Sequence, residues 1–500
     1  MATLSSELQG TIEDLDTKHT ALIEAVRAYK DGSLAKTANE LMDESDRLAT
    51  VLQGREQAML GYIATMTDKK IPSLILDFAN NTYLAGARSV TEGGAFTDVI
   101  DFSRSSEATF CGAGGLLARV GADVPRLTHD PVTGESKGLM IESFNKNHIL
   151  HSENLTENTW TKARVTATRD TSTMCPDGTL TATLISLTAE TGAHYVAQSG
   201  SLTADYYYVK SIFLKYGGMQ FARVQTATQS WAEGSNGVTV DLINKTITEL
   251  TGDADKVFIT EWANDWIQVS VVNQMGSVDN LAGLLVGPAL TGTGSVIFEG
   301  TEQPAFYAWG GEIKLGSTPS SYIRTYGSSA SRQQDVAKVY LKRFGSLNYA
   351  NMSYYMDISE YLPSNAKNPA LMGLHDEDSV GSLSNTKYMY GKPGAMTLVS
   401  NTAESLNVGL YNRGQGRQES GKFAFSMSNA TGRVILAQSD GTVDNVAMVS
   451  PQTPISDSVV LRLMEHPSAS LSPPGSTTCK EVRMYAVALT QLECEELVNA

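Results

Sequence analysis

Aromatic, amide and carboxylate side chains occur together in a short, turn-like stretch of this sequence. Trp262 closely precedes Asn264 and Asp265, and Trp231 lies upstream in a segment with nearby Gly and Ser residues. Aromatic faces stack on the apolar faces of sugar rings, whereas carboxylates and amides form hydrogen bonds with sugar hydroxyls. These four residues are therefore candidate glycan-binding residues, and a second candidate group comprises Tyr388, Tyr390 and Tyr411.

The alternative interpretation of the tryptophans is that they fill protein cores. A β-sandwich usually buries a large aromatic side chain between its sheets. Trp160, Trp266 and Trp309 lie in strand-like segments and fit that role well.

Catalytic and metal-binding patterns are absent from the sequence. It contains no G-x-S-x-G, H-E-x-x-H or P-loop motif, and the spacing of its 54 carboxylates singles out no acid pair for glycoside cleavage. The four cysteines include no C-x-x-C pair, and the acidic run at 375–379 lacks an EF-hand frame. We therefore expect no enzyme activity, no cofactor and no metal site.

Charge and hydropathy exclude two classes of partner. The chain has a net charge of -16, and its Lys and Arg residues form no basic cluster of the kind that binds nucleic acid. No stretch approaches the roughly 20 apolar residues of a membrane span, and no secretory signal opens the sequence. We expect a protein that folds in a cytosol with reduced thiols.

The first 70 residues have a helical period. Apolar residues recur every three or four positions, which is the a/d pattern of a coiled coil and needs a partner helix. One interpretation is a parallel oligomeric stalk; the others are a helical hairpin or the core helices of a monomeric domain. The positions of this heptad seam are Leu8, Ile12, Leu15, His19, Leu22, Val26 and Tyr29.

From residue 71 onward the pattern changes to strands and turns. Period-two alternation with frequent turn residues predicts a mainly β protein with an N-terminal α-helical anchor and tandem β-sandwich domains. We expect a helical oligomerisation region at 1–70, a small β connector at 71–148, and sandwiches at 149–335 and 336–500.

Several of these segments resemble bacteriophage tail fibre and spike proteins. The run from Trp309 to Thr325 matches the pattern W-G-x-E-x-x-x-G-S-x-P-(S/T)-S-Y-I-x-T, which closes a carbohydrate-binding-module-like jelly roll in that family. The stretch 101–142 contains D-F-x-R-x-S-x-A-T, P-R-x-x-x-D-P-x-T-G and G-L-M-I-E in the family's order, with Met140 where the family usually has Leu. The end of the chain, with L-T-x-x-E at 489–493, is similar to that of concanavalin A-like domains.

The resemblance implies a virion protein made in the host bacterial cytoplasm. It implies a homotrimer whose N-terminal helices attach to other virion proteins and whose sandwiches bind a host cell-surface polysaccharide. Two alternatives remain: a purely structural collar, baseplate or capsid-decoration protein, and a polysaccharide depolymerase.

The heptad seam generates a prediction about assembly. Replacing Leu15 and Leu22 with Asp places charge in the seam, so the oligomer should dissociate to monomers in analytical ultracentrifugation. An unchanged oligomer would show that the seam does not join the chains.

Overall fold

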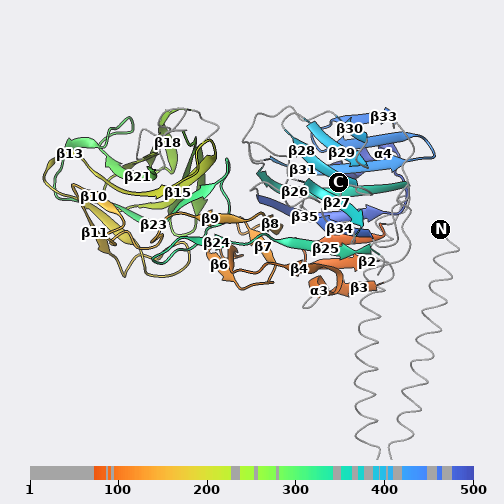
Figure 1. Ribbon diagram of the computed structural model, residues 1–500, viewed down its shortest axis with the longest axis horizontal. Helices are drawn as coiled ribbons and strands as arrows, with labels where there is room; N and C mark the ends of the chain where they lie inside the picture. Colours follow the sequence, from red (N-terminus) through yellow and green to blue (C-terminus); the bar gives the residue numbers. More distant parts are fainter. Residues whose placement is uncertain are drawn as a thin grey trace, which may run out of the picture. The chain divides into compact units, whose positions relative to one another are not determined.

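The computed structural model shows a mainly β protein (Figure 1). The heptad seam and the whole predicted helical anchor at 1–70 lie outside the described residues. The structure describes residues 72–85, 88–91, 95–226, 237–252, 257–276, 281–341, 351–362, 370–376, 387–392, 395–400, 404–408, 419–447, 459–463 and 476–500.

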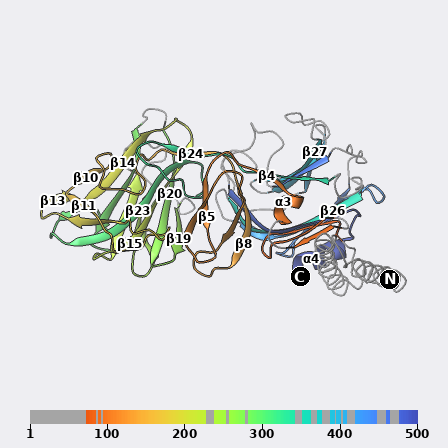
Figure 2. The same cartoon turned by 90° about the horizontal axis from the view of Figure 1, so that it is seen from below.

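A first sandwich is formed by two antiparallel sheets that face each other, with β14 in one layer and β15 in the other (Figure 2). One sheet has the order β10 (Thr161–Ala163), β14 (Tyr195–Ser201), β21 (Leu281–Ala289), β16 (Phe221–Thr226), β17 (Gly237–Asp241) and β18 (Thr246–Thr251). The other has the order β11 (Val165–Arg169), β12 (Thr183–Leu187), β23 (Pro304–Leu315), β15 (Tyr207–Tyr216), β20 (Trp266–Gln274) and β19 (Val257–Trp262). The short strands β13 (Thr191–Ala193) and β22 (Ile297–Glu299) pair with each other.

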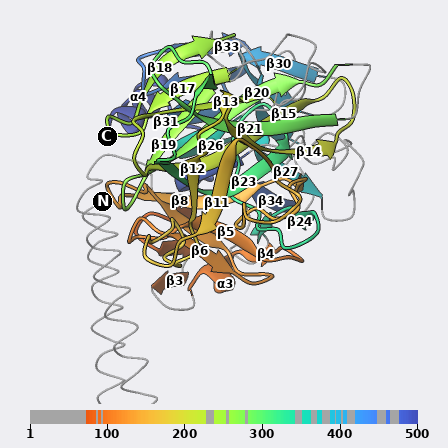
Figure 3. The same ribbon diagram turned by 90° about the vertical axis from the view of Figure 1, so that its left-hand side faces the viewer.

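Apolar residues from both sheets meet in the core of the first sandwich. Val224, Val240 and Val286 of one sheet belong to the same buried cluster as Ile212 and Val269 of the other. Consecutive strands pass repeatedly from one sheet to the other, as in the expected jelly roll. Figure 3 shows β12 beside its partner β23.

The sheet that contains β15 is covered on both faces. Its outer face carries a second apolar cluster, in which Phe213, Trp266 and Trp309 pack against Cys111 and Leu117. The last two residues belong to the hairpin of β5 (Ala108–Cys111) and β6 (Leu117–Val120). Because both faces are covered, β15 is buried at nearly every position and its sequence does not alternate.

A second sandwich combines strands from distant parts of the chain. One sheet has the order β3 (Arg88–Thr91), β2 (Thr82–Ala85), β1 (Leu74–Asp77), β35 (Ser476–Tyr485), β26 (Asn351–Leu362), β31 (Glu419–Ser428), β32 (Arg433–Gln438) and β33 (Val443–Ala447). On this sheet, β8 (Ser136–Glu142) pairs with β35 and with β7 (Arg126–His129). The facing sheet has the order β30 (Glu404–Val408), β29 (Ala395–Ser400), β28 (Lys387–Lys392), β27 (Ala370–Asp376), β34 (Val459–Leu463), β25 (Val336–Tyr340) and β4 (Asp101–Ser103).

This pairing corrects the prediction of a separate connector at 71–148. Leu74 pairs with Met484, and Val336 pairs with Ser103, so strands before and after the first sandwich share two sheets. The first sandwich is therefore inserted between strands of the second, and the predicted sandwich at 336–500 is completed by strands from 74–142. The short helix α3 (Ala95–Val99), labelled in Figure 2, belongs to this sandwich, and its residue Phe96 is part of the shared core.

The C-terminal helix α4 (Gln491–Asn499) packs on the outside of the second sandwich. Thr490 accepts a hydrogen bond from the Glu493 backbone N–H, and the Glu493 carboxylate accepts one from the Thr490 backbone N–H, which forms a capping box. Leu497 and Val498 contact the outer face of the sheet near Tyr355 and Ile435. The strand-then-helix ending indicated by L-T-x-x-E is confirmed.

Charged side chains are buried where the chain enters and leaves the first sandwich. At this point β9 (Asn145–Asn147) pairs with β24 (Ala330–Arg332). The adjoining side chains, which we call the ion cluster, are three arginines and two carboxylates, all at most 2% exposed: Arg104, Arg126, Glu142, Arg332 and Asp335.

Each carboxylate of the ion cluster is shared between two arginines. Glu142 lies 2.6 Å from Arg126 and 2.8 Å from Arg332, and also accepts hydrogen bonds from the Ser321 backbone N–H and hydroxyl. Asp335 pairs with Arg104 at 2.9 Å and with Arg126. Burial alone would raise the pKa of Glu142, but Arg332, Arg126 and the hydrogen bonds from Ser321 outweigh it and hold that pKa well below its usual range.

This pKa shift predicts the effect of removing the Glu142 charge. Glu142→Gln leaves buried arginines uncompensated, which should destabilise the fold by about 3–5 kcal/mol. Because the folded-state pKa is depressed, the stabilisation by Glu142 is present above its unfolded pKa of about 4.3 and is lost as the pH falls below it. Thermal melts from pH 6 to pH 2 should therefore show a steeper loss of stability in the wild type than in the variant, and parallel curves would contradict this assignment.

Candidate functional site

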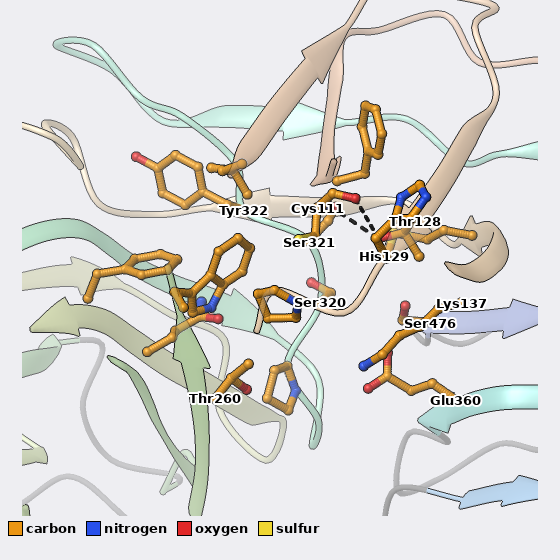
Figure 4. A pocket seen from close by; sticks show the side chains of 18 residues that line it. Cys111, Thr128, His129, Lys137, Thr260, Ser320, Ser321, Tyr322, Glu360 and Ser476 are labelled. Atoms are coloured by element: carbon orange, nitrogen blue, oxygen red, sulfur yellow. Dashed lines mark hydrogen bonds between the residues drawn. The ribbon is translucent and has the colours of Figure 1, made fainter. Parts of the chain in front are cut away.

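A cavity of about 130 Å³ lies on the outer side of Trp262, and we call it the Trp262 pocket. Thr260 and Gln268 of the first sandwich contribute to one wall, together with Ser320 from the segment after β23. Glu360 of β26 and Ser476 of β35 line it from the second sandwich, and Figure 4 shows them across the cavity from Thr260 and Ser320. The apolar part of the lining comprises Phe110, Leu117, Pro131, Met140, Phe213, Trp262, Pro319 and Tyr322.

Three buried polar atoms at this pocket have no hydrogen-bond partner within the described part of the chain. They are the indole nitrogen Nε1 of Trp262, the ring nitrogen Nδ1 of His129 and the hydroxyl Oγ of Ser320. A buried polar group without a partner costs about 1–3 kcal/mol, and native proteins leave few of them. The lining of the pocket therefore combines residues that carry unpaired polar atoms with an aromatic wall.

Charged groups occupy one side of the Trp262 pocket. The ammonium nitrogen of Lys137 lies 3.4 Å from a carboxylate oxygen of Asp130. Burial raises the pKa of Glu360, whereas the positive charge of Lys137 lowers it by a smaller amount. Burial also raises the pKa of the Cys111 thiol to about 12, so this wall residue is an unreactive thiol at neutral pH rather than a nucleophile. The pocket therefore offers hydrogen-bonding groups and aromatic surface, without an activated cysteine.

The geometry separates the residues of the first predicted glycan-binding group. Trp262 lines the pocket, whereas Asn264 and Asp265 are exposed in the tight turn between β19 and β20, where Trp262 pairs with Trp266. Both turn residues have positive φ, 59° and 60°, a backbone conformation that Asn and Asp tolerate better than other side chains. Turn geometry therefore accounts for their presence. Asp265 lies 3.4 Å from Lys245, and the carbonyl of Asn264 accepts a hydrogen bond from Lys215.

The second predicted group is described only in part. Tyr388 and Tyr390 belong to β28, whose backbone pairs with β27 and β29. Trp231 and Tyr411 lie outside the described residues.

The three other tryptophans are core residues. Trp160, Trp266 and Trp309 are at most 1% exposed, and their indole N–H groups donate to His151, Met174 and Thr181 respectively. The predicted burial of all three is confirmed, but only Trp160 lies in the cluster between the two sheets, whereas Trp266 and Trp309 belong to the cluster on the outer face of the sheet that contains β15. Sequence reasoning missed His129, Ser320 and Glu360. His129 stands at a variable position of the P-R-x-x-x-D-P-x-T-G motif and Ser320 lies in the motif that begins at Trp309, whereas Glu360 lies in neither.

Among the residues that the structure describes, no group of three or more His, Cys, Asp or Glu side chains is placed to hold a metal ion. Within the same part of the chain, no helix is long and apolar enough to cross a membrane.

Comparisons with known proteins give weak likenesses. No family model matches the chain, and neither does any curated protein. The carbohydrate-binding module CBM40 of the Ruminococcus gnavus IT-sialidase, bound to α2,6-sialyllactose, matches with a TM-score of 0.26 and 11% identity over 31% of this chain and 84% of that one.

Two further solved structures have similar scores. The NanB sialidase of Streptococcus pneumoniae matches with a TM-score of 0.26 and 12% identity over 32% of this chain and 26% of that one. A structure of botulinum neurotoxin type C, whose interaction partners are two ganglioside molecules, matches with a TM-score of 0.26 and 11% identity over 33% and 40%. TM-scores this low assign neither a family nor a ligand to this chain.

The two paired tryptophans of the β19–β20 turn generate a prediction. Trp266→Phe removes an indole N–H that donates to Met174 at 2.7 Å, so it should cost about 1–3 kcal/mol more than Trp262→Phe, whose N–H has no partner. Both variants lose the same ring atoms, so the difference between their chemical denaturation curves isolates the hydrogen bond. Equal losses would mean that the Trp262 N–H is already satisfied.

Proposed function

We propose that this protein is a non-catalytic bacteriophage virion component that binds a host cell-surface polysaccharide, with one sugar ring in the Trp262 pocket. The observation that carries the proposal is the combination of unpaired buried polar atoms with an aromatic wall. A sugar ring presents an apolar face and hydroxyls that both donate and accept hydrogen bonds, which suits this lining.

The size of the Trp262 pocket suits a single ring. Its volume of about 130 Å³ is close to the roughly 150 Å³ of a cavity that holds benzene, and is below the usual 300–1,000 Å³ of drug-sized ligand sites. Such a pocket binds one ring weakly, so useful adsorption would come from several copies acting together. The homotrimer implied by the resemblance to phage fibre proteins would provide them.

The virion context is proposed on the motifs of the sequence. The motifs that contain Arg104, Arg126 and Glu142 occur in the order typical of phage tail proteins, and the motif that begins at Trp309 resembles the segment that closes a jelly roll in that family. The N-terminal helices would attach the chain to other virion proteins, and the sandwiches would face the host.

A purely structural virion role is the second candidate, and one observation favours it. The motif residues Glu312, Ser321 and Tyr322 bind other parts of the same chain. Glu312 accepts a hydrogen bond from the Ile323 backbone, Ser321 donates to Glu142, and Tyr322 donates to Ser152. The motif therefore supports the architecture whether or not a ligand is bound.

Trp262→Phe tests the binding role with little structural cost. It keeps an aromatic ring in the wall and removes the unpaired N–H, so affinity for the bound glycan should fall about five- to tenfold, the value of one hydrogen bond of about 1–1.4 kcal/mol. Binding would be measured on an array of purified bacterial surface polysaccharides and by adsorption of particles to host cells.

Trp160→Phe is the matched control, because Trp160 is buried in the first sandwich and does not line the pocket. It should leave glycan affinity unchanged. If the wild type binds no polysaccharide while particles assemble and adsorb normally, the structural role replaces the binding role. Release of reducing sugar from a bound polysaccharide would show a depolymerase instead.

A further inference from the structure

A second, larger cavity opens beside the Trp262 pocket, and we call it the polar groove. Its volume is about 490 Å³, within the range of ligand-binding sites. Lys137 lines both cavities, so the two adjoin at that residue. The lining comes from the β7–β8 turn, β8, β26, the start of β31, the turn between β32 and β33, β35 and α4. It comprises Asp130, Glu135, Lys137, Asp357, Ile358, Ser359, Ser420, Gly421, Lys422, Ser439, Lys480 and Val498.

The charges that line the polar groove balance. Three lysines face three carboxylates, and two pairs are already formed, Lys480 with Glu135 at 2.5 Å and Lys137 with Asp130 at 3.4 Å. A groove with no excess charge gives a charged ligand no net attraction, and the chain as a whole is strongly acidic at -16.

The remaining charges, Asp357 and Lys422, are directly opposite each other on β26 and β31. In the described part of the chain, neither side chain has a hydrogen bond or an ion pair with another group. Both are half-buried, and burial raises the pKa of Asp357 while the Coulombic influence of Lys480, Lys422 and Arg483 opposes that shift. The groove thus retains one acceptor and one donor for a ligand.

Hydroxyl groups add to this pattern. Ser420 is exposed at the start of β31, and the Ser439 hydroxyl accepts a hydrogen bond from the Lys422 backbone N–H, which leaves its own proton free to be donated. Neighbouring sugar hydroxyls, each a donor and an acceptor, match a lining in which carboxylate, ammonium and hydroxyl groups alternate.

We infer that the polar groove is a second subsite for the same glycan chain and that it takes uncharged sugar residues. This inference rests on the proposed glycan binding at the Trp262 pocket and specifies its ligand as a neutral oligosaccharide. The chain of sugars runs past Lys137, with one ring in the pocket and the following rings in the groove.

Asp357→Asn and Lys422→Met test the groove. Each removes one hydrogen-bonding charge, and because burial disfavours the Asp357 charge, the Asn variant should keep the wild-type melting temperature. The probes are neutral polysaccharides and acidic polysaccharides from bacterial surfaces on one array, followed by calorimetry with the monosaccharide and the longer oligosaccharides of the best neutral binder. Asp265→Asn is the matched control, because it makes the same change at an exposed turn outside both cavities.

The expected result is a five- to tenfold loss of affinity for oligosaccharides in both groove variants, with no change for the monosaccharide. Trp262→Phe should weaken the binding of both ligands, and Asp265→Asn neither. If the groove variants bind oligosaccharides as the wild type does while Trp262→Phe weakens them, the groove inference fails and the pocket remains. If Trp262→Phe also has no effect, or no glycan on the array binds, the proposed function fails too. Preference for acidic polysaccharides would overturn the assignment of neutral sugars.

Discussion

The ion cluster is the interaction on which the arrangement of this protein depends. Taking charges out of water costs several kcal/mol for each ion, and only close partners compensate for it. Arg126 lies between Glu142 and Asp335, and it also donates to the Thr109 carbonyl, so three separate segments must be in place before its charge is satisfied. If one of these segments is missing, Arg126 is buried without a full set of partners and the cost of removing its charge from water is not compensated. The junction therefore forms cooperatively, with all of its segments in place or none.

The position of the Trp262 pocket follows from that junction. Ser321 donates to Glu142 of the ion cluster, and the adjacent Ser320 and Tyr322 form part of the pocket wall. His129 and Lys137 on β7 and β8 are connected to the same cluster through Arg126 and Glu142 on those strands. The pocket is therefore held by a rigid junction rather than by a mobile loop, which lowers the entropic cost of ligand binding.

Local patterns in the sequence predicted local structure well. Alternation indicated the strands, the L-T-x-x-E run indicated α4, and the burial of Trp309 followed from its strand context. The insertion of one sandwich within the other could not be predicted, because the pairing of Leu74 with Met484 leaves no signal in either segment. Asn264 and Asp265 were predicted to bind a ligand because they have short polar side chains. The same side chains are favoured in tight turns, so residue type alone does not distinguish the two roles.

The candidate site shows a similar limit. Trp262 could be identified as a candidate from its residue type. The residues next to His129 and Glu360 in the sequence do not indicate a pocket, because these two side chains come together only after strands from both sandwiches have paired. Arg104, Arg126 and Glu142 stand in recognisable motifs, yet a motif does not say whether an arginine is exposed to solvent or buried in an ion pair. Their mutual distances decide that, and those are a property of the completed fold.

The inserted sandwich has a consequence for synthesis on the ribosome. Strand β1 is synthesised early, but the edge that pairs with β35 stays unpaired until β35 is made about 400 residues later. At roughly 5–20 residues per second this wait is about 20–80 s. During that time the first sandwich can fold, while the apolar strands β1 and β8 have no partner in β35 and present open edges to other nascent chains. High-level expression should therefore increase the demand for chaperones in the cell that makes this protein. Slower translation at lower temperature should favour the correctly paired chain.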